Sequence, residues 1–358
     1  MLEASTQRGP GLVEVLPNHR FDEAALGRYL AERLPGFSHG CVVRQFQGGQ
    51  SNPTFLLETP AATYVLRKKP PGKLLASAHM VEREYKVQKA LAGSAVPVAP
   101  MLLLCEDASI VGTPFYLMGY VAGRVIPTAD LPDLSPAERQ GVYRSLVETL
   151  ASLHQVDWRA AGLGEFGRPD NYAARQIDRW TKQYAASKTD DIEEMEQLSA
   201  WLVAHLPANA ASSIVHGDFR VGNTIIHPSE PRLAAVLDWE LATIGDPLAD
   251  LAYLCMAYSM PPGGPGVSGG LRGAKLSSLG VPSEEEVLAA YARASARPDI
   301  PHWDFYKALA FFRIAAIVQG VYARGLAGNA ADASAVQQGE RVRMMAEIGW
   351  EIASSAKN

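Results

Sequence analysis

The sequence predicts an α+β fold. We expect an antiparallel five-stranded sheet and one helix in an N-terminal lobe, and helices in most of the remainder. Short runs rich in β-branched and aromatic residues, separated by turn signals, occur before residue 120. After that point apolar residues recur at intervals of three and four, the spacing of one helix face. A length of 358 residues accommodates two lobes, which we expect to cover residues 1–120 and 121–358.

The expected elements of the N-terminal lobe follow a loose tail over residues 1–20. A helix is expected over residues 21–34, where a Pro-Gly pair stops it. A second helix is expected over residues 76–92. The strands are expected over residues 42–47, 53–58, 63–68, 101–106 and 114–121.

Helix start signals mark the C-terminal lobe. Ser135 with Glu138, and Ser283 with Glu286, match the capping box, in which each side chain bonds the other residue's backbone N–H. Residues 261–282 are rich in glycine and proline and predict a long loop, which is either a cover over substrate or a surface insertion. The helices are expected over residues 135–155, 190–206, 247–260, 302–325 and 331–354.

A central segment concentrates the residue types of a metal site. Two apolar β-branched runs flank a Pro-Ser-Glu-Pro turn, which predicts a hairpin over residues 223–237. Asp218, Asn223 and Asp238 fall at its open end. Carboxylate and amide oxygens suit Mg²⁺, which takes oxygen ligands and is usually shared with substrate phosphates.

A glycine-rich turn separates the first two expected strands and consists of Gly48, Gly49, Gln50, Ser51 and Asn52. Glycine lets backbone N–H groups approach a phosphate closely, so the turn is a candidate phosphate loop. A pair of glycines is also an ordinary hairpin turn, which is the alternative interpretation.

The order of these motifs is similar to that of the protein-kinase-like superfamily. From His216 the chain reads His-Gly-Asp-Phe-Arg-x-Gly-Asn, then Leu-Asp-Trp-Glu, then Gly-Asp-Pro-x-x-Asp. This wording resembles the aminoglycoside phosphotransferase and choline kinase-like family, and most of all the kinase-like domains associated with acyl-CoA dehydrogenases. The resemblance implies a bilobal protein-kinase-like fold and an ATP-dependent kinase that transfers the γ-phosphoryl group to a small-molecule hydroxyl.

The resemblance also implies roles for the central residues. Asp218 would accept or orient the proton of the substrate hydroxyl, and Arg220 would contact the transferred phosphoryl group. Asn223 and Asp238 would hold Mg²⁺ against the phosphates of ATP. A structural role, in bracing the loop or the next helix, is expected of His216, Asp246 and Asp250.

The same resemblance places the nucleotide in the N-terminal lobe. Arg67 aligns with the lysine that pairs ATP phosphates in kinases, and Glu84 would face the sheet and pair with it. The alternative for Arg67 is a solvated basic strand end. Adenine would bond the backbone after Met118, where Gly119 offers its carbonyl and Val121 its amide.

Composition narrows the range of partners. The net charge is −5 and the chain has no basic run, so neither nucleic acid nor a membrane is expected as a partner. No apolar run of membrane-spanning length and no hydrophobic signal core are expected. Three scattered cysteines fit a reducing cytoplasm.

The acceptor is defined only by class. A polycationic aminoglycoside calls for a strongly acidic pocket, whereas the acidic patch within residues 190–196 also fits a helix start favoured by its dipole. The resemblance implies a hydroxyacyl-CoA or hydroxy acid instead. The alternatives are an antibiotic phosphotransferase, a non-catalytic ATP-binding module and a metal-dependent phosphohydrolase. The phosphohydrolase would need further histidine or carboxylate metal ligands, which the motif lacks. The sequence determines neither the oligomeric state nor the choice between ATP and GTP.

Overall fold

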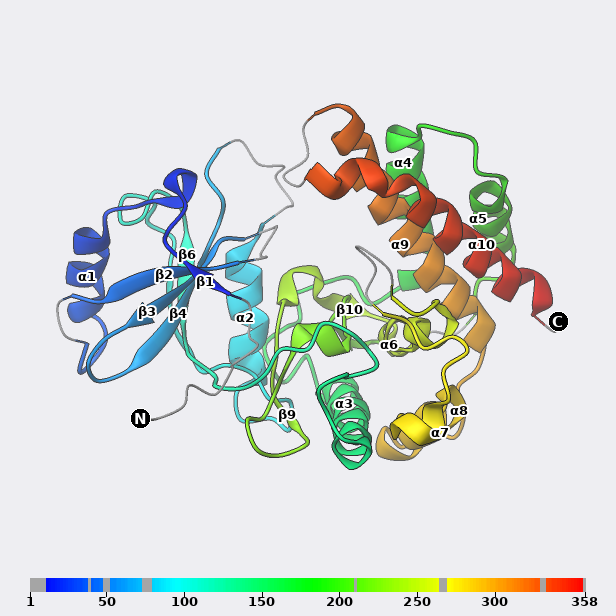
Figure 1. The fold of residues 1–358 in the computed structure, drawn as a ribbon, viewed down its shortest axis with the longest axis horizontal. Coiled ribbons are helices and arrows are strands. Elements are labelled where there is room, and N and C mark those ends of the chain that lie inside the picture. The colour runs from blue at the N-terminus through cyan, green and yellow to red at the C-terminus, as the bar shows by residue number, and fades with distance from the viewer. Residues whose placement is uncertain are drawn as a thin grey trace. The chain divides into compact units, whose positions relative to one another are not determined.

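The structure is a computed structural model, and its elements are labelled in Figure 1. The residues that it describes are 11–37, 40–47, 52–72, 79–208, 211–263, 269–328 and 333–356. Contacts divide the chain into two compact units, each assembled from several segments. The first unit contains residues 1–126, 161–163 and 223–242, and the second contains residues 127–160, 164–222 and 243–358.

The first unit is built on an antiparallel sheet of six strands in the order β1-β2-β3-β4-β6-β5. The prediction of five strands is one short, because the expected tail contributes a strand in which Leu12 and Val13 pair with Phe46 and Gln45. A two-residue strand leaves no periodicity to detect. The strands are β1 (Leu12–Val13), β2 (Val42–Phe46), β3 (Thr54–Glu58), β4 (Thr63–Lys68), β5 (Met101–Cys105) and β6 (Phe115–Gly119).

A helix covers each face of this sheet (Figure 1). Side chains on a strand alternate between the faces, so Phe55 and Leu57 join one core cluster while Leu56 joins the other. The first cluster includes side chains of α1 and the second includes the start of α2. These helices are α1 (Glu23–Ala31) and α2 (Val81–Leu91). The sheet thereby presents one face of β4 to α2.

The predicted hairpin is present, and it belongs to the first unit. It consists of β8 (Thr224–Ile226) and β9 (Leu233–Val236). Ile226 and Arg124 exchange backbone hydrogen bonds of 2.9 Å in both directions. This pairing explains why residues 223–242 belong to the same unit as the N-terminal segment. The predicted division of the chain at residue 120 placed them in the other lobe.

Two further features hold the hairpin in place. The N–H of Val236 donates to the Pro97 carbonyl at 2.9 Å. Gly123 allows the close approach on the other side, since a Cβ there would lie 2.3 Å from the carbonyl oxygen of Ile226. A larger residue at this position would push the hairpin away from the segment that follows the sheet.

The second unit is mostly helical, with a two-stranded pairing of β7 and β10. Both predicted capping boxes are present, at Ser135 and Ser283. Helix α4 was not predicted; its N-cap residue, Asn171, has a left-handed backbone and makes no side-chain cap hydrogen bond. The elements are α3 (Pro136–Gln155), α4 (Tyr172–Ser187), α5 (Glu193–Ala204), β7 (Ser213–Val215), β10 (Thr243–Gly245), α6 (Pro247–Ser259), α7 (Leu276–Leu279), α8 (Glu284–Ala294), α9 (Trp303–Leu326) and α10 (Gly339–Ser355).

Helix α9 is the central helix of the second unit. It is 24 residues long and meets the length and composition of a membrane span, so the expectation that no apolar run reaches this length was wrong. The helix packs against α4, α6 and α10. A helix that is apolar on most sides is the usual core helix of a large unit. Arg313 is a buried charged residue in its middle.

The loop expected over residues 261–282 is regular in part, because it includes α7. Gly270 donates its N–H to the Pro261 carbonyl at 2.9 Å, and Leu271 is buried. Residues 264–268 lie outside the described residues. Closure of this loop over a substrate stays a prediction.

Candidate active site

Arg67 joins several acidic side chains in the first unit. Its Nε lies 2.9 Å from Oε2 of Glu84 on α2, and its Nη2 lies 2.9 Å from Oδ1 of Asp238. Glu240 is farther away, at 3.9 Å. Burial alone would lower the pKa of Arg67, but attraction to Glu84 and the other acids raises it above its usual value. The structure thus places Arg67 and Glu84 in the ion pair expected of them.

Glu84 is buried, forms the ion pair with Arg67, and accepts hydrogen bonds from two side chains. The Tyr116 hydroxyl donates to Oε2 at 3.0 Å, and the Asn52 amide donates to Oε1 at 2.7 Å. Burial raises the pKa of Glu84 to about 7, while Arg67 and the Tyr116 hydroxyl oppose that shift. The carboxylate is therefore fixed in one orientation toward Arg67.

The predicted phosphate loop is described only at its last residue. Asn52 is buried, and its side-chain oxygen lies 3.2 Å from Nδ1 of His79. Its amide nitrogen is bonded to Glu84, so this side chain supports the ion pair. A phosphate contact of Asn52 stays a prediction. The other members of the loop lie outside the described residues, namely Gly48, Gly49, Gln50 and Ser51.

Asn223 and Asp238 lie at the open end of the hairpin. The N–H of Leu237 donates to the Asn223 carbonyl at 2.8 Å, which holds Asn223 beside the residue that precedes Asp238. Asp238 has a φ of 62° and a ψ of 62°, a left-handed conformation that is uncommon outside glycine and is often found at functional sites.

The side chain of Asp238 is 41% exposed, although one of its oxygens is bonded to Arg67. An exposed carboxylate and a neighbouring amide are oxygen donors of the kind that Mg²⁺ shares with phosphates. Asn223 and Asp238 therefore fit a magnesium site that the phosphates would complete.

The end of β6 offers an open backbone acceptor and an open donor. Gly119 donates its N–H to the Pro100 carbonyl at 2.9 Å, and proline has no N–H to bond the Gly119 carbonyl in return. Within the described chain no hydrogen bond uses the N–H of Val121. Met118 packs in the core cluster just before them. A planar ligand with a matching donor and acceptor, such as adenine, is complementary to this pair.

In the second unit, the loop that carries Asp218 is fixed through its backbone. The N–H groups of His216 and Gly217 donate to the two carboxylate oxygens of Asp250, at 2.6 and 2.8 Å. Arg313 donates to the Gly217 carbonyl, and the N–H of Asp218 donates to Nδ1 of His216 at 3.2 Å. Gly217 has a φ of 86°, which glycine adopts without strain. Asp218 therefore projects from a braced turn.

Asp250 is itself held by a buried histidine. Burial alone would raise its pKa, but hydrogen bonds from His154 and from the Gly217 N–H leave the pKa below its usual value. Burial lowers the pKa of His154, which favours the neutral ring. Nε2 of this ring lies 3.5 Å from Asp250, and Nδ1 accepts from the Tyr291 hydroxyl at 2.6 Å. Asp246 caps α6 by accepting from the backbone.

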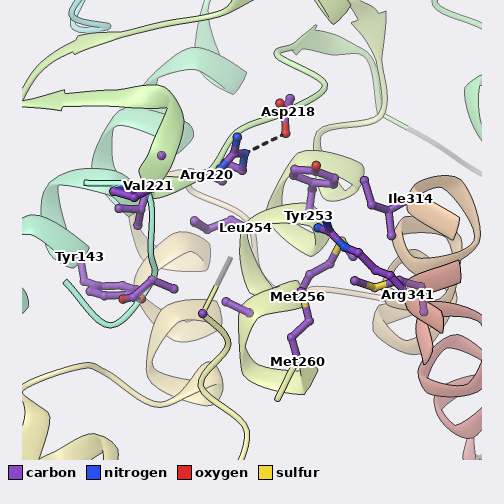
Figure 2. Close-up of a pocket in the computed structure, with 16 residues that line it drawn as sticks. Tyr143, Asp218, Arg220, Val221, Tyr253, Leu254, Met256, Met260, Ile314 and Arg341 are labelled. Atoms are coloured by element: carbon purple, nitrogen blue, oxygen red, sulfur yellow. Dashed lines mark hydrogen bonds and ion pairs between the residues drawn. The ribbon is translucent and has the colours of Figure 1, made fainter. Parts of the chain in front are cut away.

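Asp218 and Arg220 line a cavity of about 360 Å³ whose lining residues all belong to the second unit (Figure 2). Arg220 Nε lies 3.4 Å from Oδ1 of Asp218. Tyr253 of α6 lines the cavity close to Asp218, and Arg341 of α10 reaches the cavity beside the Tyr253 ring (Figure 2). The volume lies within the range of small-molecule sites, about 300–1,000 Å³.

Three residues around Asp218 were missed by sequence reasoning. Arg313 had a signal, because an arginine inside an apolar helix is buried only when it is bonded. Tyr253 and Arg341 belong to no motif and reach the cavity through the packing of α6 and α10.

The predicted site residues fall in two groups. The first unit holds Asn52, Arg67, Glu84, Met118, Gly119, Val121, Asn223 and Asp238, and the second holds Asp218 and Arg220.

The phosphotransferase enzyme family matches this sequence over residues 42–309. The chain belongs to this family. The matched range includes both groups of site residues, and it covers most of the chain.

Longer proteins contain a region similar to this phosphotransferase-family chain. Acyl-CoA dehydrogenase family member 11 of Rattus norvegicus is 46% identical over 347 residues, which are 95% of this chain and 44% of that protein. Acyl-CoA dehydrogenase family member 10 of Mus musculus is 46% identical over 331 residues, which are 92% of this chain and 31% of that protein. The chain thus spans less than half of the length of these relatives.

Solved structures of phosphotransferases share its fold. A proposed aminoglycoside phosphotransferase of Ralstonia eutropha has a TM-score of 0.86 and 46% identity, covering 95% of this chain and 100% of that one. Aminoglycoside phosphotransferase APH(4)-Ia, solved with AMP-PNP and hygromycin B, has a TM-score of 0.61 and 17% identity, covering 93% and 100%. The second likeness concerns the fold alone. The predicted kinase-like α+β fold is confirmed.

Proposed function

We propose that this phosphotransferase is an ATP-dependent small-molecule kinase that transfers the γ-phosphoryl group of ATP to a hydroxyl with the help of Mg²⁺. The observation that carries the proposal is the bridge that Arg67 forms between Glu84 and Asp238, at 2.9 Å on each side. Kinases use such a buried cation–acid pair to bind ATP phosphates. Here the same guanidinium also positions the carboxylate proposed to hold the metal.

The nucleotide side of the proposal uses the first unit. Gly119 and Val121 would bond adenine through their open carbonyl and amide. Arg67 would contact the phosphates, and Asn223 and Asp238 would hold the metal. When bound, Mg²⁺ neutralises phosphate charge and orients the triphosphate.

The acceptor side uses the second unit. Asp218 would accept the hydroxyl proton. Because hydrogen bonds brace its loop, the carboxylate is already oriented, and the reaction need not supply the entropy cost of orienting it. Arg220, 3.4 Å from Asp218, would provide a guanidinium for the phosphoryl oxygens.

For the acceptor we propose a hydroxy acid or a hydroxyacyl-CoA. The cavity around Asp218 contains one acidic side chain in its lining, which disfavours a polycationic aminoglycoside. The similarity to acyl-CoA dehydrogenase family members covers less than half of those proteins, so no dehydrogenase activity is assigned to this chain.

We also propose a cytoplasmic location, which the three free cysteines support.

The test is acceptor-dependent release of ADP from ATP and Mg²⁺, with a panel of hydroxy acids and hydroxyacyl-CoAs. Asp218→Asn is expected to lower turnover by about 10²–10⁴-fold, since it removes the general base, while nucleotide binding persists. Asp178→Asn is the matched control, because Asp178 lies on α4 and its side chain is 63% exposed.

Two outcomes would replace this proposal with an alternative. Nucleotide binding without ADP release from any acceptor would indicate a non-catalytic ATP-binding module. Release of inorganic phosphate from monoesters without ATP would indicate a phosphohydrolase.

A further inference from the structure

The cavity beside Asp218 has an excess of positive charge. Among the residues that the structure describes, its charged lining side chains are Asp218, Arg220 and Arg341, so two arginines and one aspartate give a formal charge of +1. Within a partly enclosed site the attraction between opposite charges exceeds that in bulk water, because the effective dielectric constant is lower. An anionic group is therefore favoured in this cavity over a cationic one.

The two guanidinium groups differ in their surroundings. Arg220 is ion-paired with Asp218 at 3.4 Å. Arg341 enters from α10, its Nη1 donates to Oε1 of Gln338 at 3.5 Å, and its guanidinium lies beside the ring of Tyr253 (Figure 2). Burial lowers the pKa of Arg341, but an arginine starts far enough above neutrality to stay charged at pH 7. A planar guanidinium in this position can bind a carboxylate through two parallel hydrogen bonds.

The other end of the cavity is apolar. Met256 and Met260 line the cavity from α6 (Figure 2), and Met345 lines it from α10, one turn after Arg341. Methionine is unbranched and adaptable, so it packs against aliphatic chains of varied shape. The lining thus combines a charged end with a floor suited to hydrocarbon.

We propose that Arg341 is the specificity-determining residue of this cavity. It binds the carboxylate of an aliphatic hydroxy acid, and Met256, Met260 and Met345 pack along the hydrocarbon chain. The proposal rests on the proposed kinase function, because it presumes that the cavity receives the acceptor. Within the acceptors named above, it selects the free acid over the thioester, which lacks the carboxylate.

The experiment measures binding, so that it does not depend on turnover. The probes are 3-, 4- and 5-hydroxyoctanoate and the methyl ester of each, titrated calorimetrically into the full chain with Mg²⁺ and a non-hydrolysable ATP analogue. At least one acid is expected to bind about 10-fold or more tightly than its ester, since only the carboxylate gains charge-assisted hydrogen bonds from the guanidinium.

Arg341→Met is expected to lower the affinity for that acid to the level of its ester and to leave the affinity for the ester nearly unchanged. Arg341→Lys should keep part of the preference, because it keeps the charge but not the planar fork. Arg343→Met is the matched control, since Arg343 lies on the same helix and is exposed; it should leave both affinities unchanged.

Equal affinities of wild type for acid and ester, or no binding of any acid, would overturn the proposal. An equal loss for acid and ester in Arg341→Met would also overturn it, provided that the variant still binds the ATP analogue. If that variant fails to fold, Arg341→Lys and the wild-type preference decide. Acid binding with the expected preference but no ADP release from ATP would contradict the kinase function, while it would confirm that Arg341 binds the carboxylate.

Discussion

The guanidinium of Arg67 and the carboxylate of Asp238 lie 2.9 Å apart, although 171 positions separate them in the sequence. Arg67 also binds Glu84, so one cation links the helix, the sheet and the hairpin of the first unit. Asp238 is the candidate metal ligand, and its left-handed backbone is fixed beside this cation. Loss of Arg67 should therefore disturb both phosphate binding and metal binding.

Replacement of Arg67 by methionine tests this link. The variant leaves Glu84 buried without its cation, so we expect the free energy of unfolding to fall by about 3–5 kcal/mol. ATP affinity should fall as well. Arg44→Met is the control, because the pair of Arg44 and Glu58 is 39% exposed on both sides and should contribute less than about 1 kcal/mol. Chemical denaturation and nucleotide titration measure the two effects; an unchanged ATP affinity would contradict the proposed phosphate role.

The pKa of Glu84 predicts a pH-dependent stability. Burial raises it from 4.5 to about 7, so the folded state binds this proton more tightly than the unfolded state does. The stabilising effect of the proton is fully present below about pH 4.5 and is lost as the pH rises through 7. Relative to Glu84→Gln, the wild-type free energy of unfolding should decline across that window. Parallel curves for the two proteins would show that Glu84 keeps an ordinary pKa.

Arg313 predicts a defect confined to the chemical step. Arg313→Met removes the donor to the Gly217 carbonyl and loosens the turn that presents Asp218. We expect kcat to fall by about 10²-fold, since small displacements of reacting groups have large effects. The Kd for ATP should hold. Arg179→Met is a suitable control, because Arg179 also stacks on Trp180 but is exposed. A weakened ATP affinity with normal kcat would exclude this positioning role.

Arg220 is expected to act on the transferred phosphoryl group. Arg220→Ala should lower kcat by about 10²–10³-fold, as the loss of one preorganised charged donor does in other enzymes. Arg220→Lys should recover part of the loss, because it restores the charge. Steady-state kinetics on any acceptor that passes the ADP assay measures this. Unchanged turnover in Arg220→Ala would refute the assignment.

Local signals account for most of what the sequence predicted correctly. The capping boxes at Ser135 and Ser283 act within four residues, so they are visible without tertiary information. The hairpin and the strands carry their own alternation and turn residues. The expected pairing of Arg67 and Glu84 came from the order of motifs rather than from any local pattern.

Long-range contacts account for most of what was missed. Arg313 bonds a carbonyl 96 positions away, and Arg341 reaches the cavity only because α10 packs on α9. Helix α4 has aromatic core residues such as Trp180 but no cap at its start. Such features depend on which surfaces meet, and neither spacing nor composition encodes that in a single sequence.

The first unit is assembled from discontinuous segments, and this has a consequence for biosynthesis. Domains usually fold as units while the chain emerges from the ribosome, N-terminal end first. Here the partner of Arg124 and the carboxylate that meets Arg67 are translated about a hundred residues or more later, at Ile226 and Asp238. The nascent N-terminal segment therefore lacks these native partners, and water takes their place, until residue 242 has been made.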